Sequence, residues 1–303
     1  MKKILIIKHG SLGDIVFSLA AMISIRNQYP DSAIHLLTEK KNSNFLLKSK
    51  IFDKIIIDER KNFFIKSLLI IYKLLSIRYN LIIDLQNSQR TSFYNFFFRI
   101  FHSAKISSSR NFAHFRYKIP QQGKENVTVG LFNQLGLINI KKSSYIDYSW
   151  LKVKLEEEFK KPLAIFIPGV SKNGSHKQWP ESNFAKLAKY CEEKNFDICV
   201  IGAKNDYNSA LPILNICKNV INKIDKSPPE IIYSLALKSS IIFTNDTGPG
   251  HIAALANKNI VIVANNNNIS KANLPNGKHV KKVLANSVKD IVPEDLFQFI
   301  NKV

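Results

Sequence analysis

The sequence predicts an α/β protein made of two βα domains that face each other across a cleft. Its 303 residues suit two domains of about 150 residues each, and 45% hydrophobic residues suffice for two cores. Continuous apolar segments alternate with segments of helical period, which is typical of parallel strands covered on both faces. This alternation begins again after a charged stretch, KLEEEFKKP, at 154–162. We therefore expect the first domain at residues 1–155 and the second at residues 156–303.

In the first half, each apolar run is followed by a polar turn and then by a new periodic segment. The run KILIIK (3–8) predicts the first strand, and the segment 14–28, which ends before Pro30, predicts the first helix. Three more strands are expected at AIHLLTE (33–39), KIIIDE (54–59) and NLIIDL (80–85). A helix is expected over 62–79, and the aromatic-rich SFYNFFFRIF (92–101) follows the last of these strands.

The second half repeats this order of elements. Strands are expected at LAIFIPG (163–169), FDICVIGA (196–203), SIIFTND (240–246) and NIVIVAN (259–265), the last of which closes the series. Helices are expected at 180–195, 228–239, 250–258 and near 293–302, and the asparagine run at 265–268 predicts a loop. In such folds ligands bind at the carboxyl ends of the strands, where helix N-termini point toward the crevice. The loops after the strands should therefore carry the function.

The charge balance is strongly basic. The net charge is +21 and the pI is about 9.8. Such a balance arises from drift toward Lys, Asn and Ile codons or from a polyanionic partner, either nucleic acid or an anionic membrane surface. The basic residues are spread through both halves, without a zinc finger, an RNP-like aromatic motif or a basic recognition helix. We therefore expect no dedicated nucleic-acid binding.

The apolar segments and the cysteines bear on localisation. The most apolar stretch, 62–80, is interrupted by Lys66, Lys73 and Arg78, so it predicts no membrane span. The first apolar run is too short for the hydrophobic region of a signal peptide and lacks a cleavage site. Three cysteines without a pairing or metal-ligand spacing fit a reducing compartment. A cytoplasmic location is therefore expected.

The turn HGSLGD, directly after the first strand, holds one carboxylate, Asp14. Ser11 and Asp14 have the spacing of a capping box, so Asp14 could simply start the helix. The helix dipole also favours an ionised Asp14, which suits a general base. The turn has neither G-x-G-x-x-G nor a Walker A lysine, although Glu39 at the end of the second strand keeps a weak dinucleotide-binding interpretation open. Capping and catalysis both remain possible roles for Asp14.

Two loops of the second half favour phosphate binding. In PGVSKNGSHKQWPESNF (168–184), Lys172, His176 and Lys177 precede a helix, where cations are unfavourable unless an anion lies between them. In TNDTGPGHIAAL (244–255), glycines and a hydroxyl lie at a helix start, which attracts phosphate. The alternatives are a solvated charge run in the first loop and capping by Asp246 or Thr247 in the second. A D-x-D motif and a metal-ligand spacing are missing, so no protein-bound metal is expected.

Four motifs occur in order along the chain: ILIIKHGSLGDIVFSLAAM near the N-terminus, IIDLQNSQRTS (82–92), HKQWPESNFAKLA (176–188) and NDTGPGHIAALA (245–256). Together they resemble glycosyltransferase family 9, the ADP-heptose:lipopolysaccharide heptosyltransferases. The resemblance implies a GT-B fold of two Rossmann-like domains and an inverting, metal-independent sugar transfer from a nucleotide donor, with no further cofactor. By the resemblance, Asp14 corresponds to the catalytic base, supported by Ser11 and Gly13, and Lys177 lies on the donor diphosphate. Asp246, Thr247, Gly248 and His251 fall in the donor-binding loop.

The resemblance also implies partners and leaves open points. ADP-heptose would be the donor, a lipopolysaccharide core or lipid A-type molecule the anionic acceptor, and the inner membrane face a peripheral location. We expect acceptor contacts in 92–118 and at Arg90, Arg99, Arg110 and Arg116. The loop ANNNNISKANLPNG (264–277) replaces the Gly-Pro-Thr-type loop common in the family, and Asp206 is a possible ribose-side acid. The alternatives are a GT-B enzyme with another nucleotide-sugar and a non-catalytic basic binding protein.

Overall fold

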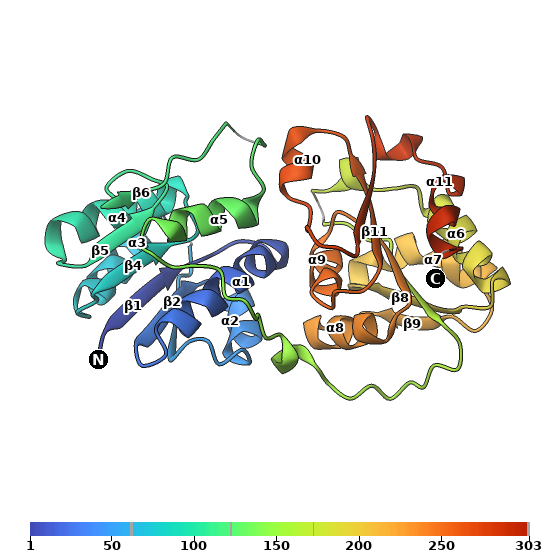
Figure 1. Cartoon of the computed structure of the whole chain (residues 1–303), viewed down its shortest axis with the longest axis horizontal. Helices are drawn as coiled ribbons and strands as arrows, with labels where there is room; N and C mark the ends of the chain where they lie inside the picture. The colour runs from blue at the N-terminus through green and yellow to red at the C-terminus, as the bar shows by residue number, and fades with distance from the viewer. Residues whose placement is uncertain (61–62, 122, 172, 302–303) are drawn as a thin grey trace. The chain divides into compact units, whose positions relative to one another are not determined.

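The computed structural model describes residues 1–60, 63–121, 123–171 and 173–301. The chain forms two compact units, Met1–Trp150 (unit 1) and Leu151–Val303 (unit 2). Each unit contains one six-stranded parallel sheet with helices on both of its faces (Figure 1). Strand and helix alternate along both units, as expected from the alternation of apolar and periodic segments.

The sheet of unit 1 has the strand order β3-β2-β1-β4-β5-β6. Its strands are β1 (Lys3–Ile7), β2 (Ala33–Thr38), β3 (Lys54–Ile57), β4 (Leu81–Asp84), β5 (Lys105–Ser108) and β6 (Phe115–Arg116). Its helices are α1 (Leu12–Gln28), α2 (Lys40–Leu47), α3 (Phe63–Leu75), α4 (Gln89–Phe101) and α5 (Val127–Gly136). The direction of strand addition reverses between β1 and β4, so the loops after these two strands flank the switch point, where ligands bind in such sheets.

The sheet of unit 2 has the strand order β12-β11-β10-β7-β8-β9. Its strands are β7 (Leu163–Ile167), β8 (Asp197–Gly202), β9 (Ile221–Ile224), β10 (Ile241–Asn245), β11 (Ile260–Asn265) and β12 (Val280–Ala285). Its α-helices are α6 (Glu181–Glu193), α7 (Tyr207–Ile216), α8 (Pro229–Lys238), α9 (Gly248–Ala254), α10 (Asn268–Ala272) and α11 (Glu294–Ile300). Here the switch point lies between β7 and β10. In both units, therefore, the loops that carry the sequence motifs follow the two strands at the switch point.

Each unit has its own hydrophobic core. In unit 1, Leu5 and Ile7 of β1 pack with Ile70 and Leu74 of α3 and with Phe98 of α4. In unit 2, Phe166 of β7 and Phe243 of β10 stack at a ring distance of 5.4 Å, beside the fully buried Trp179. Strands buried on both faces explain why β1, β7 and β10 are continuous apolar runs in the sequence.

The structure corrects several expected elements. β11 does not close the second sheet, because β12 pairs with it in parallel. The sequence of β12, VKKVLA, is only half-buried and carries two lysines, so it lacks the continuous apolar run of a central strand. The helix expected at 250–258 begins at Gly248 and ends at Ala254, because Pro249 fits the first turn of a helix. The asparagine run is no simple loop: Asn265 ends β11 and Asn267 caps α10, accepting a hydrogen bond from Ser270 N.

Candidate functional site

In unit 1, Asp14 completes a capping box at the start of α1. Its Oδ2 accepts hydrogen bonds from the backbone N and the Oγ of Ser11, both at 2.7 Å, and Ser11 Oγ accepts from Asp14 N at 3.4 Å. The Asp14 side chain is exposed. Within the described part of the chain, its Oδ1 accepts no hydrogen bond. The predicted cap is therefore confirmed, and it leaves one carboxylate oxygen accessible to a ligand hydroxyl.

Gly10 allows this arrangement because it has no side chain. Its φ is +110°, and a Cβ on it would lie 2.6 Å from Asp14 Oδ2. The peptide of Gly10 is held on both sides: its N–H donates to Glu39 Oε1 at 3.2 Å, and its carbonyl accepts from Asn42 Nδ2 at 3.1 Å. Gly13, in the first turn of α1, is buried. The turn HGSLGD is thus anchored to the end of β2 and the start of α2.

Glu39 binds other residues of the protein, which argues against a role in binding a ribose. Its carboxylate pairs with Arg60 at 2.8 Å and with Lys41 at 3.0 Å. Burial alone would raise the pKa of Glu39, but the hydrogen bonds from Arg60, Lys41 and Gly10 N lower it to about 2. Glu39 therefore stays ionised and keeps accepting the hydrogen bond from Gly10. The end of β2, which suggested a dinucleotide site, is instead a support for the Asp14 turn.

The loop after β4 packs beside the Asp14 turn. The fully buried Asp84 accepts hydrogen bonds from Gln86 N and Asn87 N, both at 3.0 Å. Gln86 in turn accepts from His9 N at 2.9 Å. Lys8 lies buried nearby, where burial lowers its pKa while the charges of Asp14 and Asp84 oppose that shift. The D-L-Q segment therefore positions the loop in which Asp14 lies.

The structure corrects one expected acceptor contact and shows a cluster that sequence reasoning missed. Arg90 is buried and donates to Tyr94 OH at 2.5 Å and to Arg60 O at 3.0 Å, so it faces the protein interior. Asp58, also buried, accepts from Tyr94 OH at 2.8 Å and lies 3.2 Å from His9 Nε2. The sequence signal was Asp58, the first of two acids directly after the β3 run. Arg99, Arg110 and Arg116 are exposed, as an acceptor contact would require.

In unit 2, three of the predicted donor residues meet at the switch point. Lys177 Nζ lies 2.5 Å from Asp246 Oδ2, and His251 Nε2 lies 3.3 Å from Asp246 Oδ1. Asp246 is 3% exposed at its side chain and Lys177 is 30% exposed. The carboxylate thus bridges Lys177 of the loop between β7 and α6 and His251 of α9, and the Lys177 ammonium remains partly exposed.

The charge on Asp246 is maintained by these two partners. Burial alone would raise the pKa of Asp246, but the hydrogen bonds and charges of His251 and Lys177 outweigh it and lower the pKa. An ammonium group has three donors, and Asp246 uses one of them. Lys177 is therefore fixed in direction and can still bind an anion.

Asn245 and Trp179 join the two loops that carry these residues. Asn245 Oδ1 accepts from Trp179 N at 3.0 Å, and Asn245 Nδ2 donates to Pro168 O at 2.7 Å. Trp179 Nε1 donates to Ile291 O at 2.8 Å, which anchors the buried ring. The K-x-W-P element therefore fixes the loop that presents Lys177 next to the loop that presents Asp246.

The remaining donor-loop residues begin α9. Thr247 precedes the helix without using its side chain as a cap, and Gly248 is its first residue. A Cβ on Gly250 would lie 2.6 Å from Thr244 Oγ1, so glycine permits close packing of α9 on β10. The first-turn N–H groups of a helix lack acceptors within the helix and suit an anion. Thr247 and Gly248 therefore lie where a phosphate oxygen could be bound.

Two further predicted residues have distinct surroundings. Asp206 follows β8, and a Cβ on either Gly169 or Gly202 would lie less than 3 Å from its side-chain atoms. Burial raises the pKa of Asp206, opposed by a hydrogen bond from Ala203 N at 2.8 Å. Asp206 thus lies at the carboxyl ends of β7 and β8, where a ribose-side acid is expected. His176 is exposed, and Lys172 lies outside the described residues.

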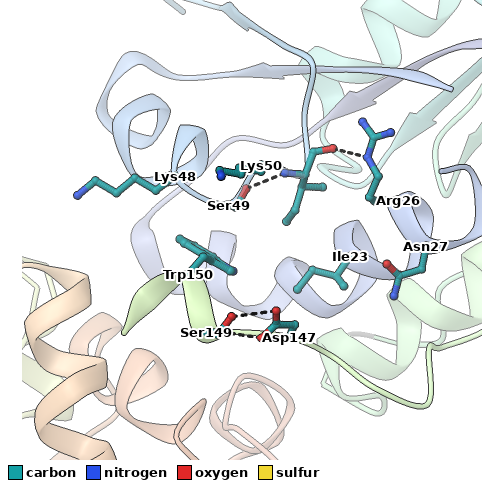
Figure 2. A pocket seen from close by; sticks show the side chains of 10 residues that line it. Ile23, Arg26, Asn27, Lys48, Ser49, Lys50, Asp147, Ser149 and Trp150 are labelled. Atoms are coloured by element: carbon teal, nitrogen blue, oxygen red, sulfur yellow. Dashed lines mark hydrogen bonds between the residues drawn. The ribbon is translucent and has the colours of Figure 1, made fainter. Parts of the chain in front are cut away.

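Three further findings concern the rest of the molecule. A hollow of about 570 Å³ in unit 1 is lined by Arg26, Ser49, Lys50 and Trp150, among others, and lies at the end of α1 remote from Asp14 (Figure 2). Among the described residues, no group of three His, Cys, Asp or Glu could hold a metal ion. None of the helices in the described ranges is long and apolar enough to cross a membrane.

Two parallel six-stranded sheets, each covered by helices, place the chain in the class of two-domain α/β proteins, and solved structures of this class resemble the chain. The E. coli ADP-heptose lps heptosyltransferase II matches with a TM-score of 0.74 at 17% identity, covering 100% of this chain and 98% of that chain. The E. coli heptosyltransferase WaaC with ADP-2-deoxy-2-fluoro heptose matches with a TM-score of 0.79 at 16% identity, covering 99% of each. The predicted GT-B fold class is confirmed.

Sequence comparison identifies the family. The lipooligosaccharide heptosyltransferase 2 of Haemophilus ducreyi is 27% identical over 292 residues, covering 86% of this chain and 82% of the relative. The lipopolysaccharide heptosyltransferase 1 of Campylobacter coli is 25% identical over 287 residues, covering 84% and 82%. The family described as glycosyltransferase family 9 (heptosyltransferase) matches residues 69–287. The chain belongs to this family and is a glycosyltransferase.

Proposed function

We propose that the chain transfers a heptose from ADP-heptose to a hydroxyl of the lipopolysaccharide inner core, with inversion and without a metal ion. The observation that carries the proposal is the Lys177–Asp246–His251 cluster beside the start of α9. The relatives named above support the sugar and the acceptor, since their names specify heptosyl transfer to lipopolysaccharide or lipooligosaccharide. The two solved E. coli structures support an ADP-linked donor.

In this mechanism, unit 2 binds the donor and stabilises the leaving diphosphate. The Lys177 ammonium, directed by Asp246, bonds a phosphate oxygen. The backbone N–H groups of Thr247, which precedes α9, and of Gly248, its first residue, bind another. These groups meet the negative charge that grows on the diphosphate as the sugar bond breaks. The chain already holds these hydrogen-bond donors in place. We therefore propose no cofactor beyond the nucleotide-sugar co-substrate.

Asp14 of unit 1 takes the proton of the acceptor hydroxyl. Its Oδ2 is bound by Ser11, so the accessible Oδ1 is the oxygen that receives the proton. The acceptor oxygen attacks the anomeric carbon, the bond to the diphosphate oxygen breaks on the opposite side, and the configuration inverts. Asp14 lies in the first turn of α1, where a carboxylate interacts favourably with the helix dipole.

The charge of the chain supports the proposed acceptor and location. A net charge of +21 suits a phosphorylated lipid acceptor, and we propose a peripheral place at the inner face of the cytoplasmic membrane. A different nucleotide-sugar remains the second candidate, because the loop 264–277 departs from the family pattern. There Asn265 Nδ2 donates to His176 O at 2.9 Å, which ties this loop to the one that presents Lys177.

A donor titration combined with an Asp14→Asn variant tests the proposal. ADP-heptose should raise the melting temperature of wild type more than UDP- or GDP-sugars, because a ligand that binds the native state stabilises it. Asp14→Asn should lower transfer to a heptose-free core acceptor in EDTA by about 10²–10⁴-fold, the usual contribution of a general base. The thermal shift by the donor should stay unchanged in this variant.

Asp31→Asn, which alters another exposed carboxylate of unit 1, is the matched control and should transfer at the wild-type rate. Wild-type turnover in Asp14→Asn would contradict the role of Asp14. A larger shift with a UDP- or GDP-sugar would contradict the donor, and loss of transfer in EDTA would contradict metal independence.

A further inference from the structure

Helix α3 has two apolar stripes, and only one of them is buried. Ile70, Ile71 and Leu74 face the core of unit 1. On the other side, four side chains follow the spacing i, i+3, i+4, i+7 and are exposed: Ile65 (66%), Leu68 (41%), Leu69 (58%) and Tyr72 (79%). This spacing is that of a helix face that is covered by apolar material. Scattered apolar side chains are common on surfaces, but a complete stripe indicates an interaction surface.

Helix α4 extends this apolar surface. It contacts α3, and Phe98 of α4 shares a core cluster with Ile71 and Leu74 of α3, so both helices cover the same face of the sheet. The side of α4 that faces away from the core exposes Phe96 (38%), Ile100 (55%) and Phe101 (65%). Two neighbouring helices thus present seven exposed apolar side chains on one side of unit 1.

The charge of the segment that carries this surface is mostly positive. Residues 63–118 contain nine lysines and arginines and a single acid, Asp84, which is fully buried. Lys66, Lys73 and Arg99 lie on α3 and α4 themselves, and Lys66 pairs with Glu59 at 2.8 Å. A second copy of the chain would bring the same positive charge to the interface and be repelled. Apolar side chains among cations instead match an anionic lipid surface.

We propose that the outward sides of α3 and α4 form a membrane-docking face for anionic phospholipid bilayers. The seven exposed apolar side chains enter the headgroup region, and Lys66, Lys73 and Arg99 contact lipid phosphates. The helices lie in the plane of the interface rather than crossing it, in agreement with the lack of a spanning helix among the described residues. The inference rests on the proposed function, because a docking face would bring the enzyme to a lipid-borne acceptor. Its test, however, needs no transfer reaction.

Vesicle flotation with the whole chain tests the docking face. Wild type should bind vesicles of phosphatidylcholine with about 30% phosphatidylglycerol, and bind pure phosphatidylcholine several-fold more weakly, because each cation near an anionic surface contributes. The triple variant Leu68→Ser, Leu69→Ser, Tyr72→Ser should bind at least about tenfold more weakly than wild type, because three apolar side chains no longer enter the bilayer. Its melting temperature should stay within a few degrees of wild type, since all three side chains are exposed.

The matched control is Tyr207→Ser, Leu211→Ser, Ile269→Ser, which removes three exposed apolar side chains of unit 2 and should bind as wild type does. Failure of wild type to bind anionic vesicles would overturn the docking face whatever its transferase activity. A wild-type dimer that only the α3 variant dissociates would overturn it in favour of self-association. Vesicle binding without transfer from any nucleotide-sugar would overturn the proposed function and leave the docking face supported.

Discussion

Asp14 and Asp246 are carboxylates that follow central strands of two similar sheets, yet their surroundings suit different tasks. Asp14 is exposed, and its hydrogen bonds with Ser11 lie on one oxygen. Asp246 is buried, and both of its oxygens face nitrogen-bearing side chains. A proton acceptor must be reached by its substrate, whereas a carboxylate that directs a lysine must hold its charge. Exposure and partners therefore separate two residues that look alike in the sequence.

The lowered pKa of Asp246 predicts a specific acid sensitivity. A carboxyl whose folded pKa lies below its unfolded value of 3.8 stabilises the protein above that value, and this stability is lost as the pH falls through the folded pKa. Asp246→Asn should lower the free energy of unfolding at pH 7 by about 1–3 kcal/mol, less than for a fully buried pair because Lys177 is partly exposed. The loss should shrink as the pH falls below about 4.

Asp206→Asn is the control of opposite sign for this experiment. Burial raises the pKa of Asp206, so its ionised form costs stability at neutral pH. The free energy of unfolding of wild type should therefore rise relative to that of this variant as the pH falls. Urea unfolding of both variants and wild type between pH 7 and 3 measures the two slopes. Parallel pH profiles for wild type and Asp246→Asn would show that the Lys177–Asp246 pair does not stabilise the fold.

At the scale of elements, the turn between β1 and α1 depends on the absence of a side chain at Gly10. Gly10→Ala places a Cβ only 2.6 Å from Asp14 Oδ2 and forces an L-residue to φ +110°. We expect a loss of about 1–3 kcal/mol in the free energy of unfolding from this strain. We also expect transfer to fall toward the level of Asp14→Asn, because the carboxylate must move away from its hydrogen bonds with Ser11.

Gly136→Ala provides the comparison, because a Cβ at the end of α5 would meet no atom within 4 Å. This variant should keep wild-type transfer and stability. Urea unfolding and steady-state transfer rates measure both variants. Full transfer activity in Gly10→Ala would mean that the base does not depend on the geometry of this turn.

Several of the strands that the sequence hides are less buried than the central strands that it predicts. Central strands such as β1, β7 and β10 are buried on both faces and therefore read as apolar runs. β12, with its two lysines, and β6, with only two residues, lie at sheet edges and lack such a run. The four motif loops follow strands β1, β4, β7 and β10, as the sequence predicts. The ion pair between Lys177 and Asp246 could not be predicted from the residues alone, because 69 positions separate the two side chains.

At the scale of the whole molecule, the two units are separate in their cores. The cluster that includes Ile7 and Phe98 consists of residues of unit 1, and the cluster that includes Phe166 and Trp179 consists of residues of unit 2. The contacts given above for the Lys177–Asp246–His251 cluster all lie within unit 2. Donor binding should therefore be a property of unit 2, whereas transfer also needs Asp14 of unit 1.

The fragment 151–303 should accordingly fold by itself and bind ADP, because it has its own six-stranded sheet, its own core and the size of an independent domain. ADP at about 100 times its Kd should stabilise the fragment by about 2.7 kcal/mol and raise its Tm by about 5–10 °C. Lys177→Met in the fragment should reduce this shift, since the ammonium that binds the diphosphate is lost. Differential scanning calorimetry measures both. A folded fragment that ADP does not stabilise, beside a full chain that it does, would show that residues of unit 1 take part in holding the nucleotide.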